Sequence, residues 1–481
     1  MHKFQKILTA ILIAANISGF CPANAEDMSL PHTITATMYN QDATEYGITY
    51  RSLDKYEKPQ VQFAKKTAGK DVFKNPLVFD ATIDNHGSLE KDHIYKAVVS
   101  GLEYDTEYIF RVGDAKRNIW SETCSFRTAP QQDEKVVFTF LYVTDSQKAP
   151  KRFGQVLGKA FSMYPEIRFI LHTGDMVENG LVEDEWKAML HDNRRYTAHT
   201  LINSISGNYH EDNGAELYIH FHKKLPENQS VEKGYFYSFD YANAHFVMLD
   251  ITDVDNNFNL SEKQIKWLEK DLEGTDKIWK IVGLHWPLYS TGPHSNYSIE
   301  WFDGLRKQLE PIFTKYNVEL VLQGHDHVYS RSKSILDGRV YVNRIYVEKK
   351  YENRNYLSVV NQKGTTYLTG GSSGTKFYSC QVPERFDGYF EVCNNLYNSM
   401  FTVITVSEKE LLVRAYIYDH ENDKAILHDI FGFAKSYANL QTMAQVREVN
   451  NHQKSFVGIA IVSSAVLMIL FKRIRMILKD K

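Results

Sequence analysis

The 481-residue sequence has few cysteines and almost no net charge. Its four cysteines are too few for the disulfide framework that replaces a hydrophobic core in small secreted domains. The 56 basic and 59 acidic side chains leave a net charge of −3, so no global positive field indicates a nucleic acid partner. Hydrophobic residues make up 43% of the chain, which excludes a wholly disordered protein.

Aromatic residues are frequent, with 30 Tyr and 27 Phe, and these residues favour half-buried strands. Residues 31–130 contain six short runs rich in Thr, Tyr and Val, separated by turn residues. This texture predicts an N-terminal β-sandwich domain of the fibronectin III or immunoglobulin type. The runs are Thr33–Tyr39, Tyr46–Arg51, Val61–Lys65, Tyr95–Val99, Tyr108–Val112 and Cys124–Thr128.

From residue 135 the sequence alternates apolar strands with helical patterns, which predicts an α/β domain over residues 135–430. Ser261 is placed to cap one of the helices. The expected helices are Phe153–Tyr164, Ser261–Leu272 and Trp301–Tyr316. The expected strands are Val136–Val143, Ile167–His172, Ala244–Ile251, Trp279–Leu284, Val318–Leu322, Thr365–Thr369, Phe401–Val406 and Leu411–Ile417.

Both ends of the chain carry apolar segments. Residues 1–25 have a basic start, an apolar run and a small-residue cleavage site at Ala23–Ala25, which predicts a secretory signal peptide. An uncleaved N-terminal anchor is the alternative interpretation. Three cysteines follow the signal, of which Cys380 and Cys393 can pair in an oxidising compartment, and the sequence does not fix their connectivity.

The second apolar segment, residues 455–471, contains no charge and would span about 25 Å as a helix. The basic tail at 472–481 favours the cytoplasmic side, so we expect a transmembrane helix preceded by a stalk at 431–454. A buried helix at the chain end is the alternative. Together the two ends predict secretion, with the membrane as a partner and the folded domains outside the cytoplasm.

Five segments place Asp, Asn or His directly after an apolar strand. In open α/β sheets the carboxyl ends of strands build the functional sites. Asp, Asn and His together supply the mixed oxygen and nitrogen ligands of a metal site. The five segments are Thr144–Gln147, His172–Asp175, Ser206–Glu211, Val282–His285 and Gly324–His327.

This ordered set resembles the calcineurin-like metallophosphoesterase superfamily and, with a sandwich in front, its purple acid phosphatase branch. The resemblance covers residues 31–430 and implies a four-layer αββα domain that binds two metal ions, which can be Fe, Mn or Zn. It implies that Asp175 bridges the two ions. It further assigns Asp145 and His327 to the first ion, and Asn208, His285 and His325 to the second.

Two positions near the implied first ion depart from the resemblance. Purple acid phosphatases carry a Tyr three residues after the bridging Asp, and its bond to ferric iron gives their colour. This chain has Glu178 there, so we expect a colourless or weakly coloured protein. The superfamily usually has a His two residues after the first Asp, where this chain has Gln147, so Gln147 is expected to be a weak or indirect ligand.

The motif around Asn208 contains one extra residue, reading Gly207-Asn208-Tyr209-His210-Glu211. The resemblance places a His directly after the Asn, where it helps to protonate the leaving group. Either Tyr209 replaces that His, or a local bulge returns His210 to the role. We favour His210 as the catalytic residue.

Other residues near these motifs have open roles. His294 lies nine residues after His285 and is a second candidate for contacting phosphate, the alternative being a solvated loop residue. His172 either supports the metal ligands from behind or packs beneath them. Gly370–Gly374 follows a predicted strand and is expected to form a tight turn at the edge of the site.

The leading functional hypothesis is hydrolysis of a small phosphorylated substrate, a phosphomonoester, by a hydroxide activated between two metal ions. An alternative is a phosphodiesterase that acts on nucleotides or lipid head groups. A third hypothesis is a surface binding protein on a degenerate phosphatase fold.

Overall fold

A computed structural model describes residues 27, 29–66, 72–84, 92–133, 135–208, 214–227, 235–255, 257–294, 299–394 and 396–436. The predicted signal peptide, transmembrane helix and basic tail lie outside these residues, as do Tyr209 and His210. Within the described ranges, no helix combines the length and the apolar character needed to cross a membrane.

The N-terminal domain is a β-sandwich of two antiparallel sheets, with strand orders β1-β2-β6-β5 and β4-β3-β7-β8, and β9 pairs with β7. Aromatic rings fill the space between the sheets, because inward-facing positions alternate along each strand. Phe63 stacks on Phe110 and meets Phe126 edge to face. The strands are β1 His32–Met38, β2 Tyr46–Ser52, β3 Pro59–Lys65, β4 Leu77–Asp80, β5 Thr82–Asp84, β6 His93–Val99, β7 Glu107–Asp114, β8 Ile119–Trp120 and β9 Cys124–Arg127.

The second domain contains an eight-stranded sheet, β12-β11-β10-β24-β25-β26-β21-β20, and a seven-stranded sheet, β13-β14-β15-β16-β22-β17-β23. A short pair, β18-β19, completes the strands described here. The strands of this domain are β10 Phe138–Val143, β11 Ile167–His172, β12 Leu201–Ser204, β13 Tyr237–Tyr241, β14 Ala244–Met248, β15 Trp279–Leu284, β16 Leu320–Gln323, β17 Tyr329–Ser332, β18 Ile335–Leu336, β19 Arg339–Val340, β20 Ile345–Tyr351, β21 Arg354–Val360, β22 Thr366–Gly370, β23 Phe390–Asn394, β24 Ser399–Val406, β25 Glu410–Asp419 and β26 Lys424–Ala434.

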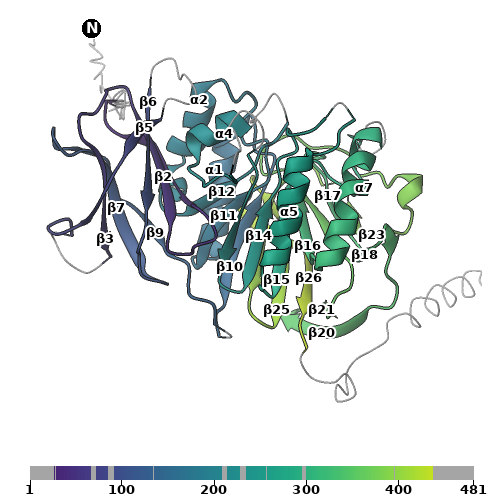
Figure 1. Ribbon diagram of the computed structural model, residues 1–481. Helices are drawn as coiled ribbons and strands as arrows, with labels where there is room; N and C mark the ends of the chain where they lie inside the picture. The colour runs from purple at the N-terminus through teal and green to yellow at the C-terminus, as the bar shows by residue number, and fades with distance from the viewer. Residues whose placement is uncertain are drawn as a thin grey trace, which may run out of the picture.

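Helices cover the outer faces of these two sheets (Figure 1). Helix α1 begins with a proline in its first turn and buries one stripe, including Phe153 and Leu157. Ser261 caps α5 as predicted, with its hydroxyl accepting the N–H of Gln264. The helices are α1 Pro150–Met163, α2 Glu183–Trp186, the π-helix η1 Lys187–His191, α3 Arg194–Thr197, α4 Gly214–His220, α5 Glu262–Gly274, α7 Ile299–Tyr316 and the 3₁₀-helix η2 Glu384–Phe386.

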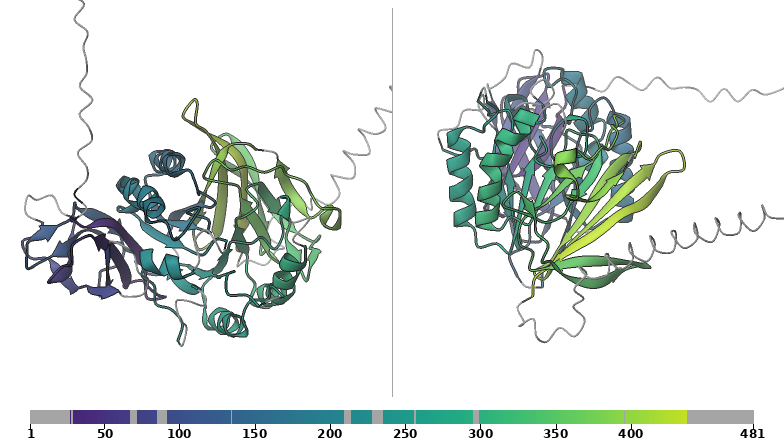
Figure 2. Two further views of the ribbon diagram at one scale, coloured as in Figure 1. Left: turned by 90° about the horizontal axis from the view of Figure 1, so that it is seen from above. Right: turned by 90° about the vertical axis from the view of Figure 1, so that its right-hand side faces the viewer.

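Alternating side chains fix the order of the layers. In β15, Ile281 points into the core between the sheets, whereas Val282 belongs to the apolar layer under α5 and α7. In β16, Leu322 points into the core between the sheets and Val321 belongs to the apolar layer under α5 and α7. The domain is therefore a mixed α/β sandwich with both sheets in its interior (Figure 2).

The sandwich lies against the α/β domain (Figures 1 and 2). Strand β1 contacts β12 and η1 of that domain. The amide of Met38 in β1 donates to the Asn203 side chain in β12 at 3.3 Å. At the other end of the chain, β26 runs to Ala434. Residues 431–434 therefore belong to the eight-stranded sheet, whereas the sequence reading assigned them to a stalk.

Parallel strands bring the predicted site segments to one edge. Strand β11 is parallel to both β10 and β12, and β15 is parallel to β16. Since the carboxyl ends of parallel strands share an edge, the loops after β10, β11 and β12 start at one edge of the eight-stranded sheet, and those after β15 and β16 start at one edge of the seven-stranded sheet. Contacts of His325 with Asp145 and of His285 with Thr173 join the two groups of loops.

Candidate metal centre

The loops that carry the predicted ligands have unusual backbone conformations. Asp145 and Asp175 have φ of 52° and 53°, and His325 and His327 have φ of 70° and 42°. This left-handed region is sparsely populated by non-glycine residues and costs about 1–3 kcal/mol each. Such strain persists where the surrounding structure imposes it, and it clusters at functional sites.

Close approach of the loops explains two of the neighbouring glycines. A Cβ on Gly174, whose φ is +93°, would lie 2.7 Å from the His285 ring. A Cβ on Gly324 would lie 2.6 Å from the Asp145 carboxylate. Both positions therefore require glycine so that the ligand loops can meet.

Asp145, Asp175 and His285 form a group that can hold a metal ion, since one ligand atom from each lies within 4.8 Å of the others. All three side chains are fully buried. Asp175 accepts the backbone and side-chain N–H groups of Asn208 at 2.7 and 2.9 Å, and the Gln147 amide at 2.9 Å. The Asp175 carboxylate is therefore the centre of the cluster.

Asp145 is held beside the Gly324–His327 segment. Its two carboxylate oxygens accept the backbone N–H of His325 at 3.0 Å, and one oxygen lies 3.3 Å from His327 Nε2. The other nitrogen of His327 contacts the carbonyl of Lys376 at 2.8 Å, which fixes the ring. Asp145 and His327 are thus paired, as the resemblance implies for the first ion.

His285 lies beside Asp175, with Nε2 at 3.2 Å from the carboxylate, while Nδ1 is 2.7 Å from the carbonyl of Thr173. The Asn208 side-chain oxygen accepts the indole N–H of Trp286 at 2.9 Å. His325 stands edge-on to His285, with ring centroids 5.3 Å apart. Asn208 and His285 therefore both contact the Asp175 carboxylate, and His325 lies beside His285.

Burial sets the protonation of this cluster. Burial raises the pKa of Asp145 to about 8, since Asp175 adds to the effect and His285 opposes it only in part. Burial acts to raise the Asp175 pKa as well, but His285 and the N–H donors hold it below the usual value. Burial acts to lower the His285 pKa, but Asp175 and Asp145 raise it to about 10. A cation that binds here displaces protons, so its affinity rises with pH.

The donor set fits a transition-metal ion. Nε2 of His285, Nδ1 of His325 and the side-chain oxygen of Gln147 are buried and make no directed hydrogen bond among the described residues. Buried polar atoms in proteins are normally satisfied, and an imidazole nitrogen beside a carboxylate is a metal ligand type. These atoms therefore have the environment of ligands.

Comparison with known families agrees with this arrangement. Residues 31–128 match the N-terminal domain of purple acid phosphatases, and residues 138–329 match the calcineurin-like phosphoesterases. The chain carries a purple acid phosphatase N-terminal domain followed by a calcineurin-like phosphoesterase domain. The resemblance stated from the sequence is confirmed.

Characterised relatives are distant. Purple acid phosphatase 1 of Ipomoea batatas is 25% identical over 312 residues, covering 58% of this chain and 59% of that protein. The purple acid phosphatase of Glycine max is 26% identical over 59% of this chain and 60% of that protein. The chain thus spans about three-fifths of the length of these curated relatives. Purple acid phosphatase PPD1 from yellow lupin (Lupinus luteus) seeds shares the fold, with a TM-score of 0.68, 17% identity and coverage of 85% of this chain and 75% of that chain.

His294 of the phosphoesterase domain lies next to the ligand cluster. Its Nδ1 is 2.7 Å from the buried carboxylate of Asp326, and its ring centroid is 4.3 Å from that of His325. Its side chain is 28% exposed, so it faces solvent on one side. The Tyr378 ring lies 5.5 Å from the His294 ring and 4.7 Å from the His327 ring. No sequence motif indicates this aromatic neighbour.

The Gly370–Gly374 turn supports the first ligand loop from behind. The hydroxyl of Ser372 donates to the carbonyl of Asp145 at 2.7 Å, and the Ser373 amide donates to the carbonyl of Thr144 at 2.9 Å. These bonds go to backbone atoms, so the turn positions Asp145, in keeping with the expectation of a tight turn at the edge of the site.

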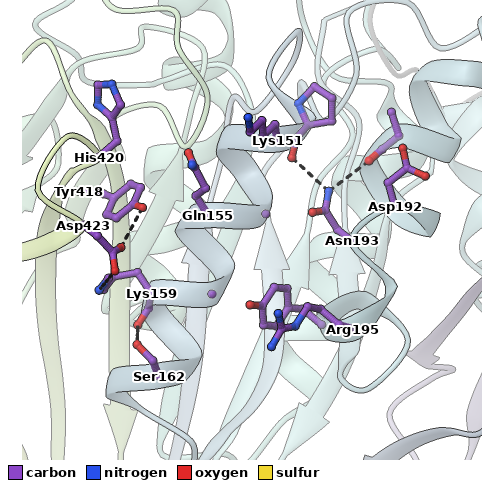
Figure 3. A pocket seen from close by; sticks show the side chains of 15 residues that line it. Lys151, Gln155, Lys159, Ser162, Asp192, Asn193, Arg195, Tyr418, His420 and Asp423 are labelled. Carbon is purple, nitrogen blue, oxygen red and sulfur yellow. Dashed lines mark hydrogen bonds and ion pairs between the residues drawn. The ribbon is translucent and has the colours of Figure 1, made fainter. Parts of the chain in front are cut away.

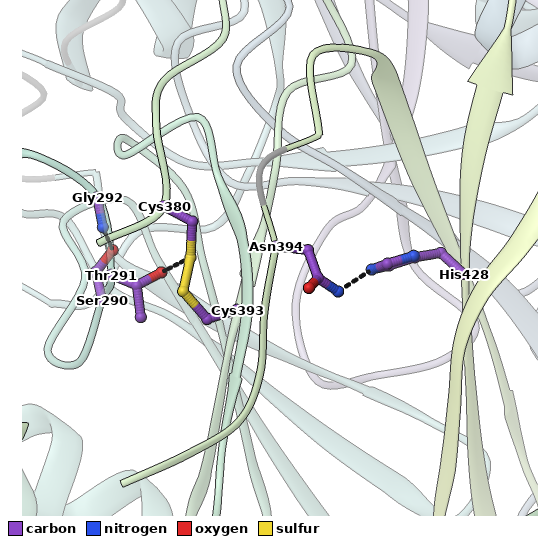
Figure 4. The surroundings of a disulfide bond; sticks show 7 residues. All are labelled: Ser290, Thr291, Gly292, Cys380, Cys393, Asn394 and His428. Atoms are coloured by element: carbon purple, nitrogen blue, oxygen red, sulfur yellow. Dashed lines mark hydrogen bonds between the residues drawn. A yellow bond between two sulfur atoms is a disulfide. The ribbon is translucent and has the colours of Figure 1, made fainter. Parts of the chain in front are cut away.

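A disulfide joins Cys380 to Cys393 and ties the segment after Tyr378 to β23 (Figure 4). Thr291 contacts the Cys380 sulfur at 3.0 Å, and the Gln381 amide donates to the Thr291 carbonyl at 2.6 Å. The two Thr291 contacts therefore hold the segment before His294 against the segment after Tyr378, and the bridge ties the latter to β23. Cys124, the remaining described cysteine, is buried and free.

Two further residues singled out from the sequence, His172 and Glu178, lie close to the ligand loops. His172 is fully buried behind the ligands, where its Nε2 is 3.0 Å from the Ser146 hydroxyl, and burial lowers its pKa to about 3. Glu178 pairs with Lys148. The predicted residues Tyr209 and His210 lie outside the described ranges.

A polar cavity of about 740 Å³ lies elsewhere on the domain (Figure 3). It follows α1 between the segment before α3 and the β25–β26 hairpin. Its charged side chains have both signs, among them Arg195 and Asp192, and Lys159 pairs with Asp423 at 2.8 Å. None of the six predicted metal ligands lines it, so it is separate from the candidate metal centre.

Proposed function

We propose that this protein is a metal-dependent phosphoesterase that hydrolyses phosphomonoesters at the centre around Asp175. The observation that carries the proposal is the convergence of two buried carboxylates and an imidazole, one from each of three separate loops. The family matches support the same reaction class, and the names of the relatives indicate phosphatases.

In this proposal Asp145 and His327 would hold one ion, Asn208, His285 and His325 would hold the other, and Asp175 would contribute to both. Bound ions supply Lewis-acid polarisation of the phosphoryl group and a water of lowered pKa. Gln147 donates its amide N–H to Asp175, which orients the shared carboxylate. Trp286 orients the Asn208 amide in the same way.

The chain's own acid–base groups act on the leaving group. His294 is placed to protonate the departing alkoxide, since one face is open and its Nδ1 is fixed by Asp326. That contact leaves Nε2 as the nitrogen that delivers the proton. His210 remains the other candidate for this role, on the sequence alone.

Parallel hydrolysis assays test the reaction class. Full-length protein is stripped with a chelator, reloaded separately with Mn²⁺, Zn²⁺ or iron, and given a chromogenic phosphomonoester or phosphodiester. We expect metal-dependent monoester turnover. Faster diester turnover assigns the protein to the phosphodiesterases, and metal binding without turnover of either ester favours a binding protein.

We also propose that the phosphoesterase domain works outside the cytoplasm, anchored by residues 455–471. The Cys380–Cys393 disulfide supports an oxidising compartment. The anchoring rests on the sequence of the C-terminal segment. Externally added protease that removes the domain from sealed cells supports the topology, and full protection of the domain contradicts it.

A further inference from the structure

A buried arginine of the sandwich contacts two helices of the α/β domain. Arg51, in β2, is 1% exposed. Its guanidinium pairs with Glu183 at the start of α2 and lies 4.0 Å from Asp92. Another of its nitrogens lies 2.6 and 2.8 Å from the two ring nitrogens of His220, at the end of α4.

Glu183 and His220 belong to two segments that meet at this point. The His220 ring stacks on the buried Trp186 of α2, with centroids 3.9 Å apart and an angle of 24° between the planes. Burial holds the pKa of His220 well below its usual value, and the nearby Arg51 adds to the effect. The neutral imidazole can therefore accept a hydrogen bond from Arg51.

Helix α2 is bonded back to the loop that leaves Asp175. The Trp186 indole donates to the carbonyl of Gly180 at 2.8 Å. The Glu185 carboxylate accepts the backbone N–H groups of Glu178 and Asn179 at 2.8 and 2.9 Å. Glu178 is only three positions after Asp175 in the chain, so the position of α2 constrains the shared carboxylate.

The sandwich also holds the end of α4. Helix α4 begins at Gly214, six residues after Asn208, and ends at His220. The sandwich holds this end through Thr35, whose hydroxyl donates to the His220 carbonyl at 2.5 Å. A Cβ on Gly47 would lie 1.9 Å from the carbonyl oxygen of His222, so β2 approaches this segment closely.

We propose that Arg51 is a positioning residue for the metal centre: one sandwich side chain fixes α2 and the end of α4, and through α2 the loop that carries Asp175. The inference rests on the proposed metal dependence. This role gives the N-terminal domain a part in metal binding, because a buried guanidinium with partners on α2 and on α4 constrains the two helices together.

The test measures zinc binding to chelator-stripped full-length protein by calorimetry, at a temperature where every variant is folded. We expect Arg51→Met to weaken zinc binding about 10-fold, the lower end of the range for residues that support metal ligands. Arg51→Lys should weaken zinc binding less than Arg51→Met, because a lysine keeps the pairing with Glu183. Asp175→Asn identifies the heat that belongs to this centre.

Arg111→Met is the matched control. Arg111 also lies on a sandwich strand, where it donates to Gln62 at 3.0 and 2.8 Å and lies over the Trp120 ring at 4.4 Å. These partners belong to the sandwich, so zinc affinity should be unchanged. Excess zinc should restore kcat in Arg51→Met, because Arg51 touches neither ion nor substrate.

Two outcomes overturn the inference. One is an Arg51→Met protein that melts earlier but binds zinc as the wild type does. If Arg51→Met does not fold, zinc binding is measured in Arg51→Lys and Glu183→Gln instead. The second outcome that overturns the inference is wild-type zinc affinity in both of these variants. A wild type that binds zinc without hydrolysing phosphoesters refutes the proposed function while the zinc measurement still tests Arg51.

Discussion

Replacing Asp175 with asparagine separates the metal-binding role of this residue from its structural role. The carboxylate accepts three N–H groups from Asn208 and Gln147 and lies 3.2 Å from His285 Nε2. In Asp175→Asn the side-chain NH₂ group takes the place of one carboxylate oxygen. Because each oxygen accepts an N–H group, the NH₂ group faces a donor in either orientation of the amide. Losing one charge-assisted hydrogen bond in a buried site costs about 2–3 kcal/mol of folding free energy.

Asp175→Asn should also weaken metal binding, and by more than the loss of a residue that only supports a ligand would. Residues that only support ligands change metal affinity by roughly 10–100-fold, and Asp175 is proposed to touch both ions. We therefore expect zinc binding at least about 100-fold weaker, which corresponds to about 2.8 kcal/mol. Turnover of the phosphomonoester should disappear with it.

Asp114→Asn is the matched control for this prediction. Asp114 is also fully buried, and it accepts backbone N–H groups of the sandwich at 2.8, 3.1, 2.9 and 3.3 Å. The control should lose a similar free energy of unfolding in urea while keeping zinc affinity. Calorimetry that finds wild-type zinc binding in Asp175→Asn refutes the assignment of the centre.

Three further predictions concern pH, colour and the leaving group. Burial acts to lower the His245 pKa, but contacts with Asp240 at 2.7 Å and Asp271 at 2.8 Å raise it to about 9. The protonated ring therefore contributes about 3 kcal/mol to the free energy of unfolding below pH ~6.5, and this contribution is lost as the pH rises from ~6.5 to ~9. His245→Gln should flatten this slope in urea unfolding, and an unchanged slope contradicts the account. Ferric-loaded wild type should show no visible absorption band, whereas Glu178→Tyr should gain one; a violet wild type is the contrary result. His294→Ala should slow the hydrolysis of an alkyl phosphate about 10²–10⁴-fold but that of a nitrophenyl phosphate much less, because nitrophenolate leaves without a proton. Equal rate losses with the two substrates argue against His294 as the general acid.

The sequence predicted the fold best where apolar runs are buried on both faces. The expected strands Ile167–His172 and Trp279–Leu284 coincide with β11 and β15. Strands β4 and β5 were missed because they are short and largely exposed, so they have little hydrophobic pattern. Their strand conformation comes from pairing with β3 and β6, which a local reading does not capture.

The order of the ligand motifs could be read from the sequence, but their supports could not. Each proposed ligand follows a strand, so a single rule about strand ends finds them. The Trp286 indole, the Lys376 carbonyl and Arg51 act through contacts between distant segments. Arg51 and Glu183 are 132 residues apart, and nothing in either local sequence indicates that they meet.

The two sides of the proposed centre differ in a way that bears on the metal. Around the second ion, Asn208 and His285 are each oriented by a hydrogen-bonding partner, Trp286 and the Thr173 carbonyl. The first ion has Asp145 and His327, while the Glu178 carboxylate pairs with Lys148. With the shared Asp175, this gives two carboxylate charges and no phenolate. Such a set suits a divalent ion better than a ferric ion, because a trivalent charge would remain uncompensated in a buried site. We therefore expect one substitution, Glu178 in place of the tyrosine, to account both for the absence of colour and for a preference for a divalent ion.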